Sequence, residues 1–121
     1  MKKYNIYQRC EDFVVSIIKL AESIPYRKSV GIINDQLIRS SGSVGANLWE
    51  GDNSRTNREF LSYFKFCLKE IEEAMFWLRV LKKTNLAYEF QINVLEKEAM
   101  ELKLILGSIY QKAKNYPVIR D

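Results

Sequence analysis

The sequence contains no histidine and only two cysteines, Cys10 and Cys67, among its 121 residues. Without histidine, the side chain that most often performs general acid–base catalysis near neutral pH is missing. The cysteines form no Cys-x-x-Cys pair, so the usual zinc-binding pattern is absent. Each cysteine lies within an apolar helical stripe, which predicts a buried, reduced thiol. We therefore expect no metal site, no cofactor and no catalytic residue.

Proline and glycine are also scarce, at two and five residues. Asn-Gly and Asp-Gly hairpin turns are absent, and no long stretch alternates polar and apolar residues. These absences argue against a β-sheet and favour long helices with short loops. No apolar run is typical of a signal peptide or a membrane span, so a cytoplasmic protein without membrane contact is expected.

Apolar residues that recur every three or four positions predict four helices in one domain covering residues 1–121. Short connections between them predict an all-α fold, an antiparallel up-down-up-down four-helix bundle. The expected helices cover about 8–23, 29–50, 57–83 and 88–114.

Several residues are typical of helix ends. Pro25 ends the first helix because proline disfavours helical backbone in the residue before it. Ser29 and Gly51 are expected to cap the two ends of the second helix. Thr56 and Glu59 have the spacing of a capping box at the start of the third helix.

The segment from residue 36 to residue 51 separates into three faces when it is wound as a helix. An apolar core stripe includes Leu37, Val44 and Leu48, and a third face carries small residues with Ile38 and Trp49. A helix with one partner needs only one apolar stripe, so we expect contacts on more than one side. The remaining face is a polar strip made of Gln36, Arg39, Ser40, Ser43, Asn47 and Glu50.

The polar strip has two interpretations. One is a contact surface for a nucleic acid or a ligand. The other, which we favour, is a hydrogen-bonded network between helices or subunits, since buried polar groups must be paired and such networks fix oligomeric state. In that network Arg39 pairs with a carboxylate, and Asn47 bridges backbone groups near the turn at Glu50 and Gly51.

This segment resembles a known bacterial family. The sequence Arg39-Ser40-Ser41-Gly42-Ser43-Val44-Gly45-Ala46-Asn47-Leu48-Trp49-Glu50-Gly51, followed by Arg55 and Glu59-Phe60-Leu61, is similar to the four helix bundle proteins encoded by intervening sequences in 23S ribosomal RNA genes. The resemblance implies a pentameric, barrel-like homo-oligomer and adds Arg55 to the polar motif. The family is also similar to accessory proteins of diversity-generating retroelements, which bind a reverse transcriptase and nucleic acid.

The predicted third helix is unusually apolar, with a heptad-like seam flanked by further apolar side chains on both sides. The seam residues are Phe60, Phe64, Cys67, Ile71, Ala74, Leu78 and Leu81. Together these cover more of the helix than one core contact uses. Such a surplus is too large to leave in water on a small monomer, so we expect a homo-oligomer; a thicker core within one chain is the alternative. The expected subunit interface comprises Ile38, Trp49, Tyr63, Phe66 and Trp77.

Basic side chains gather near the predicted helix ends, within a chain of formal net charge +4. Lysine at a helix C-terminus also pairs with the helix dipole, so a plain solubilising surface is the alternative to a binding site. An oligomer would repeat the cluster around a ring and contact several phosphates at once. Lys2 and Lys3 are expected to add to it. The residues that share one pole of the bundle are Arg27, Lys28, Arg79, Lys82 and Lys83.

These patterns predict a non-enzymatic, homo-oligomeric nucleic-acid-binding bundle. RNA is the expected ligand because of the family's ribosomal RNA gene context, and the expected partners are further copies of the chain and RNA or DNA. A protein-interaction scaffold or accessory subunit, for example for a reverse transcriptase, is the alternative. A small-ligand or catalytic protein is disfavoured by the missing chemistry.

Overall fold

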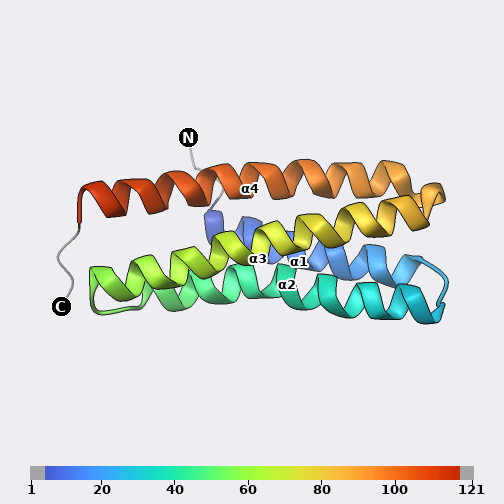
Figure 1. Cartoon of the computed structure of the whole chain (residues 1–121), viewed down its shortest axis with the longest axis horizontal. Helices are drawn as coiled ribbons and strands as arrows, with labels where there is room; N and C mark the ends of the chain where they lie inside the picture. Colours follow the sequence, from blue (N-terminus) through green and yellow to red (C-terminus); the bar gives the residue numbers. More distant parts are fainter. Residues whose placement is uncertain (1–4, 118–121) are drawn as a thin grey trace.

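The computed structural model describes residues 5–117, and the prediction of an all-α four-helix bundle is confirmed (Figure 1). Lys2 and Lys3, expected to extend the basic cluster, lie outside the described residues. No strand is present within residues 5–117. The elements are α1 (Ile6–Ser23), α2 (Lys28–Asp52), α3 (Asn57–Thr84), the short 3-10 helix η1 (Leu86–Tyr88) and α4 (Glu89–Asn115).

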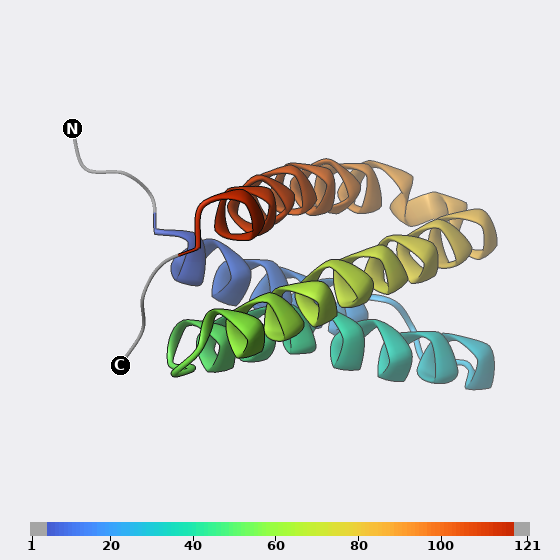
Figure 2. The same cartoon turned by 60° about the vertical axis from the view of Figure 1, so that its left-hand side comes forward.

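Consecutive helices run antiparallel along one long axis (Figure 1). Helix α2 packs against both α1 and α3, and α3 also packs against α4. Helices α1 and α4 also touch, with the least contact of these neighbouring pairs. Figures 1 and 2 show that α3 crosses α4 obliquely. The two helices meet at η1 and separate toward the end where α3 begins, which leaves a hollow between them there.

The core is built from the apolar seams that the periodicity predicts. The α3 seam is buried along its whole length, and Phe60 stacks on Phe64 with ring centroids 4.3 Å apart. Burial of a large apolar side chain stabilises a fold by about 1.5–3 kcal/mol, so this seam contributes substantially to the stability of the bundle. The buried seam residues of α3 are Phe60, Phe64, Cys67, Ile71, Ala74, Leu78 and Leu81.

The helix ends agree with the sequence at some positions and differ at others. The Oγ1 atom of Thr56 accepts the backbone N–H of Glu59 at 3.1 Å, as the capping box predicts. Ser29 does not cap α2, which begins one residue earlier after Arg27, without a side-chain cap. Gly51 lies inside α2 with a negative φ, and Asn53 is the C-cap residue.

Candidate functional site

Arg39 links α2 to α3 through the polar network on the surface of the bundle. Its Nη1 atom lies 3.4 Å from Oε1 of Glu70, its Nη2 atom forms an ion pair with Glu73, and its Nε atom lies 3.4 Å from Oε1 of Gln36. The Oε2 atom of Glu73 also accepts the indole N–H of Trp77 at 3.2 Å. The polar strip of α2 and the aromatic flank of α3 therefore meet in one network.

The charges of this network stabilise each other. The hydrogen bond from Arg39 is the largest cause that lowers the pKa of Glu73, and the bond from Trp77 acts in the same direction. The same carboxylate raises the pKa of Arg39. Because the Arg39 side chain is 46% exposed, water screens the pair, and it is worth about 0.2–1 kcal/mol in a single chain.

The rest of the polar strip is bonded within α2. The Nδ2 atom of Asn47 donates to the carbonyl oxygen of Ser43 at 2.8 Å, one turn back, instead of bridging the turn at Gly51. The hydroxyl of Ser40, which is buried, donates to the carbonyl oxygen of Gln36 at 2.8 Å. Glu50 and Arg55 lie exposed at the end of α2 and in the following loop.

The small-residue face of α2 packs against α1, as the expectation of contacts on several sides requires. A β-carbon on Gly45 would lie 3.3 Å from Cβ of Cys10, and one on Gly42 would lie 3.7 Å from Cγ2 of Val14. The expected interface residue Trp49 sits at the same boundary, with its ring 5.7 Å from that of Tyr7 and 62% of its surface exposed. Ile38 is half-buried and packs against the core.

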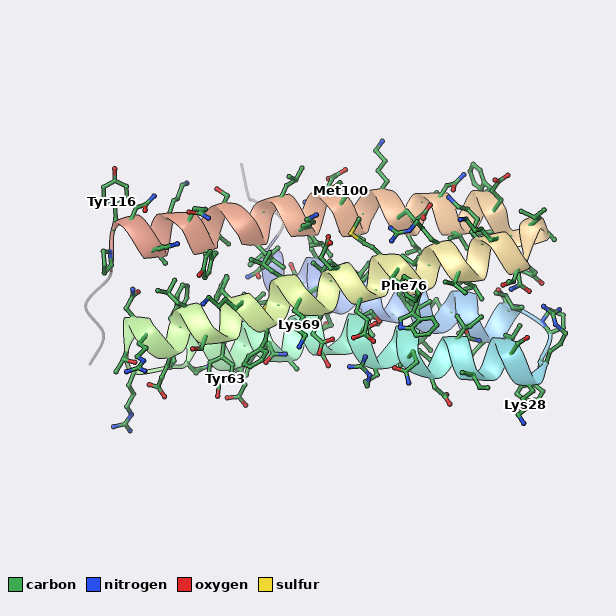
Figure 3. All side chains as sticks on the ribbon, viewed as in Figure 1. Lys28, Tyr63, Lys69, Phe76, Met100 and Tyr116 are labelled. Carbon is green, nitrogen blue, oxygen red and sulfur yellow. The ribbon has the colours of Figure 1, made fainter. Side chains whose placement is uncertain are left out.

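The other three expected interface residues lie along α3. Tyr63 and Trp77 are half-buried, whereas Phe66 is 49% exposed. Phe76, which the sequence reasoning missed, is labelled in Figure 3 and is 47% exposed. Its ring contacts that of Trp77 edge to face. We call the surface that combines these aromatic side chains with the Arg39 network the α2–α3 face; it comprises Gln36, Arg39, Tyr63, Phe66, Glu70, Glu73, Phe76 and Trp77.

The expected basic cluster lies at the end of the bundle where Lys28 is labelled in Figure 3, and we call it the basic end. Two of its members are engaged within the chain. The Nη2 atom of Arg27 donates to Oδ1 of Asn85 at 2.8 Å, and Nζ of Lys82 lies 2.6 Å from Oε1 of Glu96. The members with exposed side chains and no ion pair within residues 5–117 are Lys28, Arg79 and Lys83.

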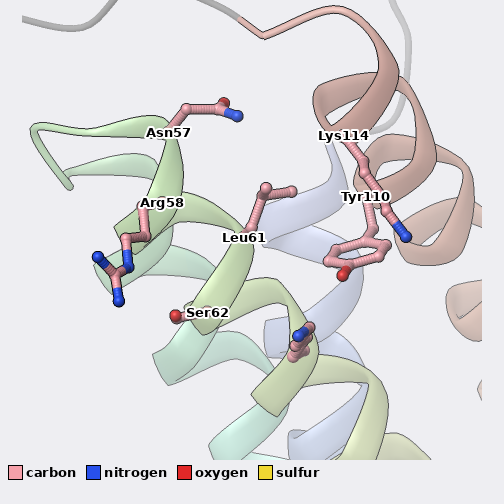
Figure 4. Close-up of a pocket in the computed structure, with 7 residues that line it drawn as sticks. Asn57, Arg58, Leu61, Ser62, Tyr110 and Lys114 are labelled. Carbon is pink, nitrogen blue, oxygen red and sulfur yellow. The ribbon is translucent and has the colours of Figure 1, made fainter.

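A second basic surface lies at the opposite end, between the start of α3 and the end of α4 (Figure 4). It is a hollow of about 490 Å³, which we call the α3–α4 hollow. The sequence reasoning did not assign it, because its cations come from two helices whose crossing angle no sequence pattern fixes. Its lining residues are Asn57, Arg58, Leu61, Ser62, Lys65, Tyr110 and Lys114.

Within residues 5–117, no three cysteine, aspartate or glutamate side chains group as metal ligands. Over the same residues, no helix has the combination of length and apolar character that crossing a membrane requires.

A comparison with protein families agrees with the sequence motif in α2 and with the four-helix bundle. A family model described as 23S rRNA-intervening sequence protein matches residues 2–108, which is most of the chain. The chain belongs to this family. The resemblance inferred from residues 36 to 61 is thereby confirmed.

A solved structure supports the fold of this family member. The crystal structure of a protein of unknown function from the S23 ribosomal protein family of Bacteroides thetaiotaomicron VPI-5482 superposes with a TM-score of 0.81. The match covers 88% of this chain and 99% of that one at 24% sequence identity, so it supports the fold alone. Among curated proteins, no sequence matches this chain.

Proposed function

We propose that this member of the 23S rRNA-intervening sequence protein family is a non-enzymatic, homo-oligomeric nucleic-acid-binding protein whose ligand is RNA. The family description names a ribosomal RNA, which supports an RNA context for the chain. The observation that carries the proposal is the basic end, where Lys28, Arg79 and Lys83 are exposed and have no ion pair within the described residues.

Exposed cations of this kind bind phosphates by releasing the counterions that surround a nucleic acid. Lys82 is a poor phosphate ligand here, since Glu96 and Asn93 already occupy its ammonium group. Arg27 donates to Asn85 and so ties the loop between α1 and α2 to the end of α3. The three remaining cations are too few for tight binding by one copy, and an oligomer would add those of its other copies.

The α2–α3 face supports self-association. Phe66 and Phe76 each leave about half of their surface in water beside the Arg39 network. Exposed aromatic side chains around a paired polar network are typical of subunit interfaces, in which aromatic and arginine residues are enriched. Burial of this face would also remove water from the Arg39–Glu73 pair and strengthen it. The pentameric number is implied by the resemblance alone.

The nucleic-acid half of the proposal is tested with the variant Lys28→Ala/Arg79→Ala/Lys83→Ala. Binding of a fluorescein-labelled single-stranded RNA is followed by anisotropy over a range of salt concentrations. We expect wild-type binding to weaken steeply with salt. In the variant, the slope of log Kd against log salt is expected to fall by about 2 for each copy that contacts the RNA, because each lost phosphate contact lowers it by about 0.7.

The control for this variant removes the same charge elsewhere, with Lys19→Ala/Lys69→Ala/Lys97→Ala, three exposed lysines outside the basic end. If both triple variants change binding equally, the basic end has no special role. If wild-type protein binds no RNA, the proposed function is wrong.

Self-association is tested by light scattering with Phe66→Asp on the α2–α3 face. Leu104→Asp is the matched control, because Leu104 is 65% exposed on α4 and lies outside that face. We expect wild type and Leu104→Asp to have the same oligomeric mass and Phe66→Asp to be a folded monomer by circular dichroism. A wild-type protein that is monomeric at micromolar concentration contradicts the proposal.

A protein-interaction scaffold is the second candidate function. The observation that favours it is the apolar groove between α1 and α4, where Phe90 is 79% exposed and Val94 is 55% exposed. An accessory subunit, for example for a reverse transcriptase, would use such a surface to hold its partner. RNA binding by the isolated protein favours the first candidate, whereas RNA binding that requires a protein partner favours the second.

A further inference from the structure

The α3–α4 hollow differs electrostatically from the rest of the boundary between these two helices. Farther from the start of α3, the lysines at this boundary are paired. The Nζ atom of Lys103 lies 2.6 Å from Oε1 of Glu72, and Nζ of Lys82 lies 2.6 Å from Oε1 of Glu96. In the hollow, none of the seven described lining residues is acidic, and Arg58, Lys65 and Lys114 have no ion pair among residues 5–117. Three like charges around one concavity favour an anion there.

The position of the cations follows from the two helices. Arg58 and Lys65 are seven residues apart and therefore lie on one side of α3, two turns from each other. Lys114 follows Tyr110 by four residues on α4, so its side chain lies beside the tyrosine ring (Figure 4). Arg58 lies on the flank of α3 away from Tyr110 (Figure 4). The charges thus follow a path across the start of α3 and do not converge on one point.

The floor of the hollow is apolar and aromatic. Leu61 and Tyr110 are half-buried and face each other between α3 and α4 (Figure 4). A tyrosine ring in a basic groove is the arrangement that proteins use for single-stranded nucleic acids, because a base stacks on the ring while cations hold the backbone. An inorganic anion has no group that uses this apolar floor.

Asn57 supplies a third, polar feature. Its Nδ2 atom donates to the carbonyl oxygen of Ala113 at 3.2 Å, which joins the start of α3 to the end of α4. Its Oδ1 atom is buried and accepts no hydrogen bond within the described structure, so it is not open to a ligand in the hollow. The bond to Ala113 holds the two helices together at this end of the hollow.

The space matches one nucleotide. The volume of about 490 Å³ lies within the range of about 300–1,000 Å³ that small-molecule sites occupy. The hollow is partly open to solvent, so a strand can enter and leave it. A duplex, whose bases are stacked on one another, cannot present a base to a ring at the bottom of such a groove.

We propose that the α3–α4 hollow seats one nucleotide of a single-stranded RNA. Its base lies on the ring of Tyr110, and the backbone phosphates follow Lys114, Lys65 and Arg58. This inference rests on the proposed function and adds to it a site at the end of the bundle opposite the basic end, together with a preference for single strands.

The test compares a short fluorescein-labelled single-stranded RNA with the corresponding duplex by anisotropy. The variant Lys65→Ala/Lys114→Ala is expected to weaken single-strand binding and to lower the salt slope by about 1.4. The matched control is Lys69→Ala/Lys97→Ala, which removes the same charge outside the hollow. Tyr110→Leu is expected to weaken single-strand binding about tenfold and to leave duplex binding unchanged. Tyr110→Phe keeps the ring and is expected to bind like wild type.

Tyr110 also packs against the core, so the thermal unfolding of each variant is measured by circular dichroism. If Tyr110→Leu does not fold, Tyr110→Phe is used in its place. In that case, photocrosslinking of 5-iodouridine RNA to wild type and Tyr110→Phe is expected to map to residues 57–65 and 110–114. If the wild type binds RNA, the hollow variants bind it equally well and the crosslinks map to other residues, the inference is wrong and the proposed function is unaffected. A wild-type protein that binds neither RNA refutes both.

Discussion

A β-carbon on Gly51 of α2 would lie 2.9 Å from Cβ of Tyr63 on α3. Real β-carbons do not approach so closely, and Tyr63 Cβ is tied to its backbone and cannot swing aside. Because glycine has no side chain, α2 and α3 can approach each other closely next to their connecting loop. We therefore expect Gly51→Ala to destabilise the fold by about 1–3 kcal/mol, even though alanine is the better helix former. Chemical denaturation measures this; a variant as stable as wild type would show that the helices can move apart freely.

Gly107 in α4 is the opposite case and serves as the matched control. A β-carbon there would have no atom within 4 Å among the described residues, apart from its own helix. Glycine in a helix interior costs about 0.5–1 kcal/mol relative to alanine. Gly107→Ala is expected to raise the free energy of unfolding by about that amount in the same denaturation experiment. Destabilisation would mean that position 107 contacts another copy of the chain.

The ion pair between Arg39 and Glu73 is expected to report on self-association. In an isolated chain, a double-mutant cycle with Arg39→Ala and Glu73→Ala should give a coupling free energy of about 0.2–1 kcal/mol, since the pair is half-exposed. If the α2–α3 face is buried between subunits, the coupling rises with protein concentration. The cycle is measured by urea unfolding at several concentrations, with Phe66→Asp as the monomeric background. A coupling independent of both concentration and background places the pair outside the interface.

The lowered pKa of Glu73 makes its contribution dependent on pH. A carboxylate whose pKa is lower in the folded state stabilises the fold above its unfolded pKa, about 4.3, and this contribution is lost as pH falls through the folded pKa. Glu73→Gln removes the charge and keeps an acceptor for Trp77. The stability gap between wild type and variant is therefore expected to be full near about pH 7 and to shrink as the pH falls below about 4. Thermal unfolding across this range measures it, and a gap that is constant with pH contradicts the ionic origin.

The bundle could be predicted from the sequence because long apolar repeats determine which helix faces are buried. The α3 seam from Phe60 to Leu81 is an example, since its spacing alone identified every buried position on it. The capping box at Thr56 and Glu59 could also be predicted from the sequence, because both partners lie within one helical turn. Local spacing thus predicted local structure and the core.

The parts of the site that depend on helix–helix geometry could not be predicted in this way. The sequence indicated that Arg39 needs a carboxylate, but Glu70 and Glu73 were identified only by the packing of α3 on α2. The sequence predicts a capping role for Gly51, because its close approach to Tyr63 arises only when α2 packs on α3. The α3–α4 hollow was missed for the same reason.

Cys10 and Cys67 are expected to resist thiol reagents as long as the chain is folded. Burial is the main cause that raises the pKa of Cys10 to about 11 and that of Cys67 to about 12. The thiol of Cys67 also donates to the carbonyl oxygen of Val44 at 3.4 Å. At about pH 8, the thiolate that reacts is therefore scarcer by more than about a hundredfold than in the unfolded chain, in which the pKa is about 8.5. In the variants Cys10→Ala and Cys67→Ala, the remaining thiol is expected to react with Ellman's reagent only when the protein unfolds. Rapid labelling of either variant in its native state would show that its remaining thiol is accessible.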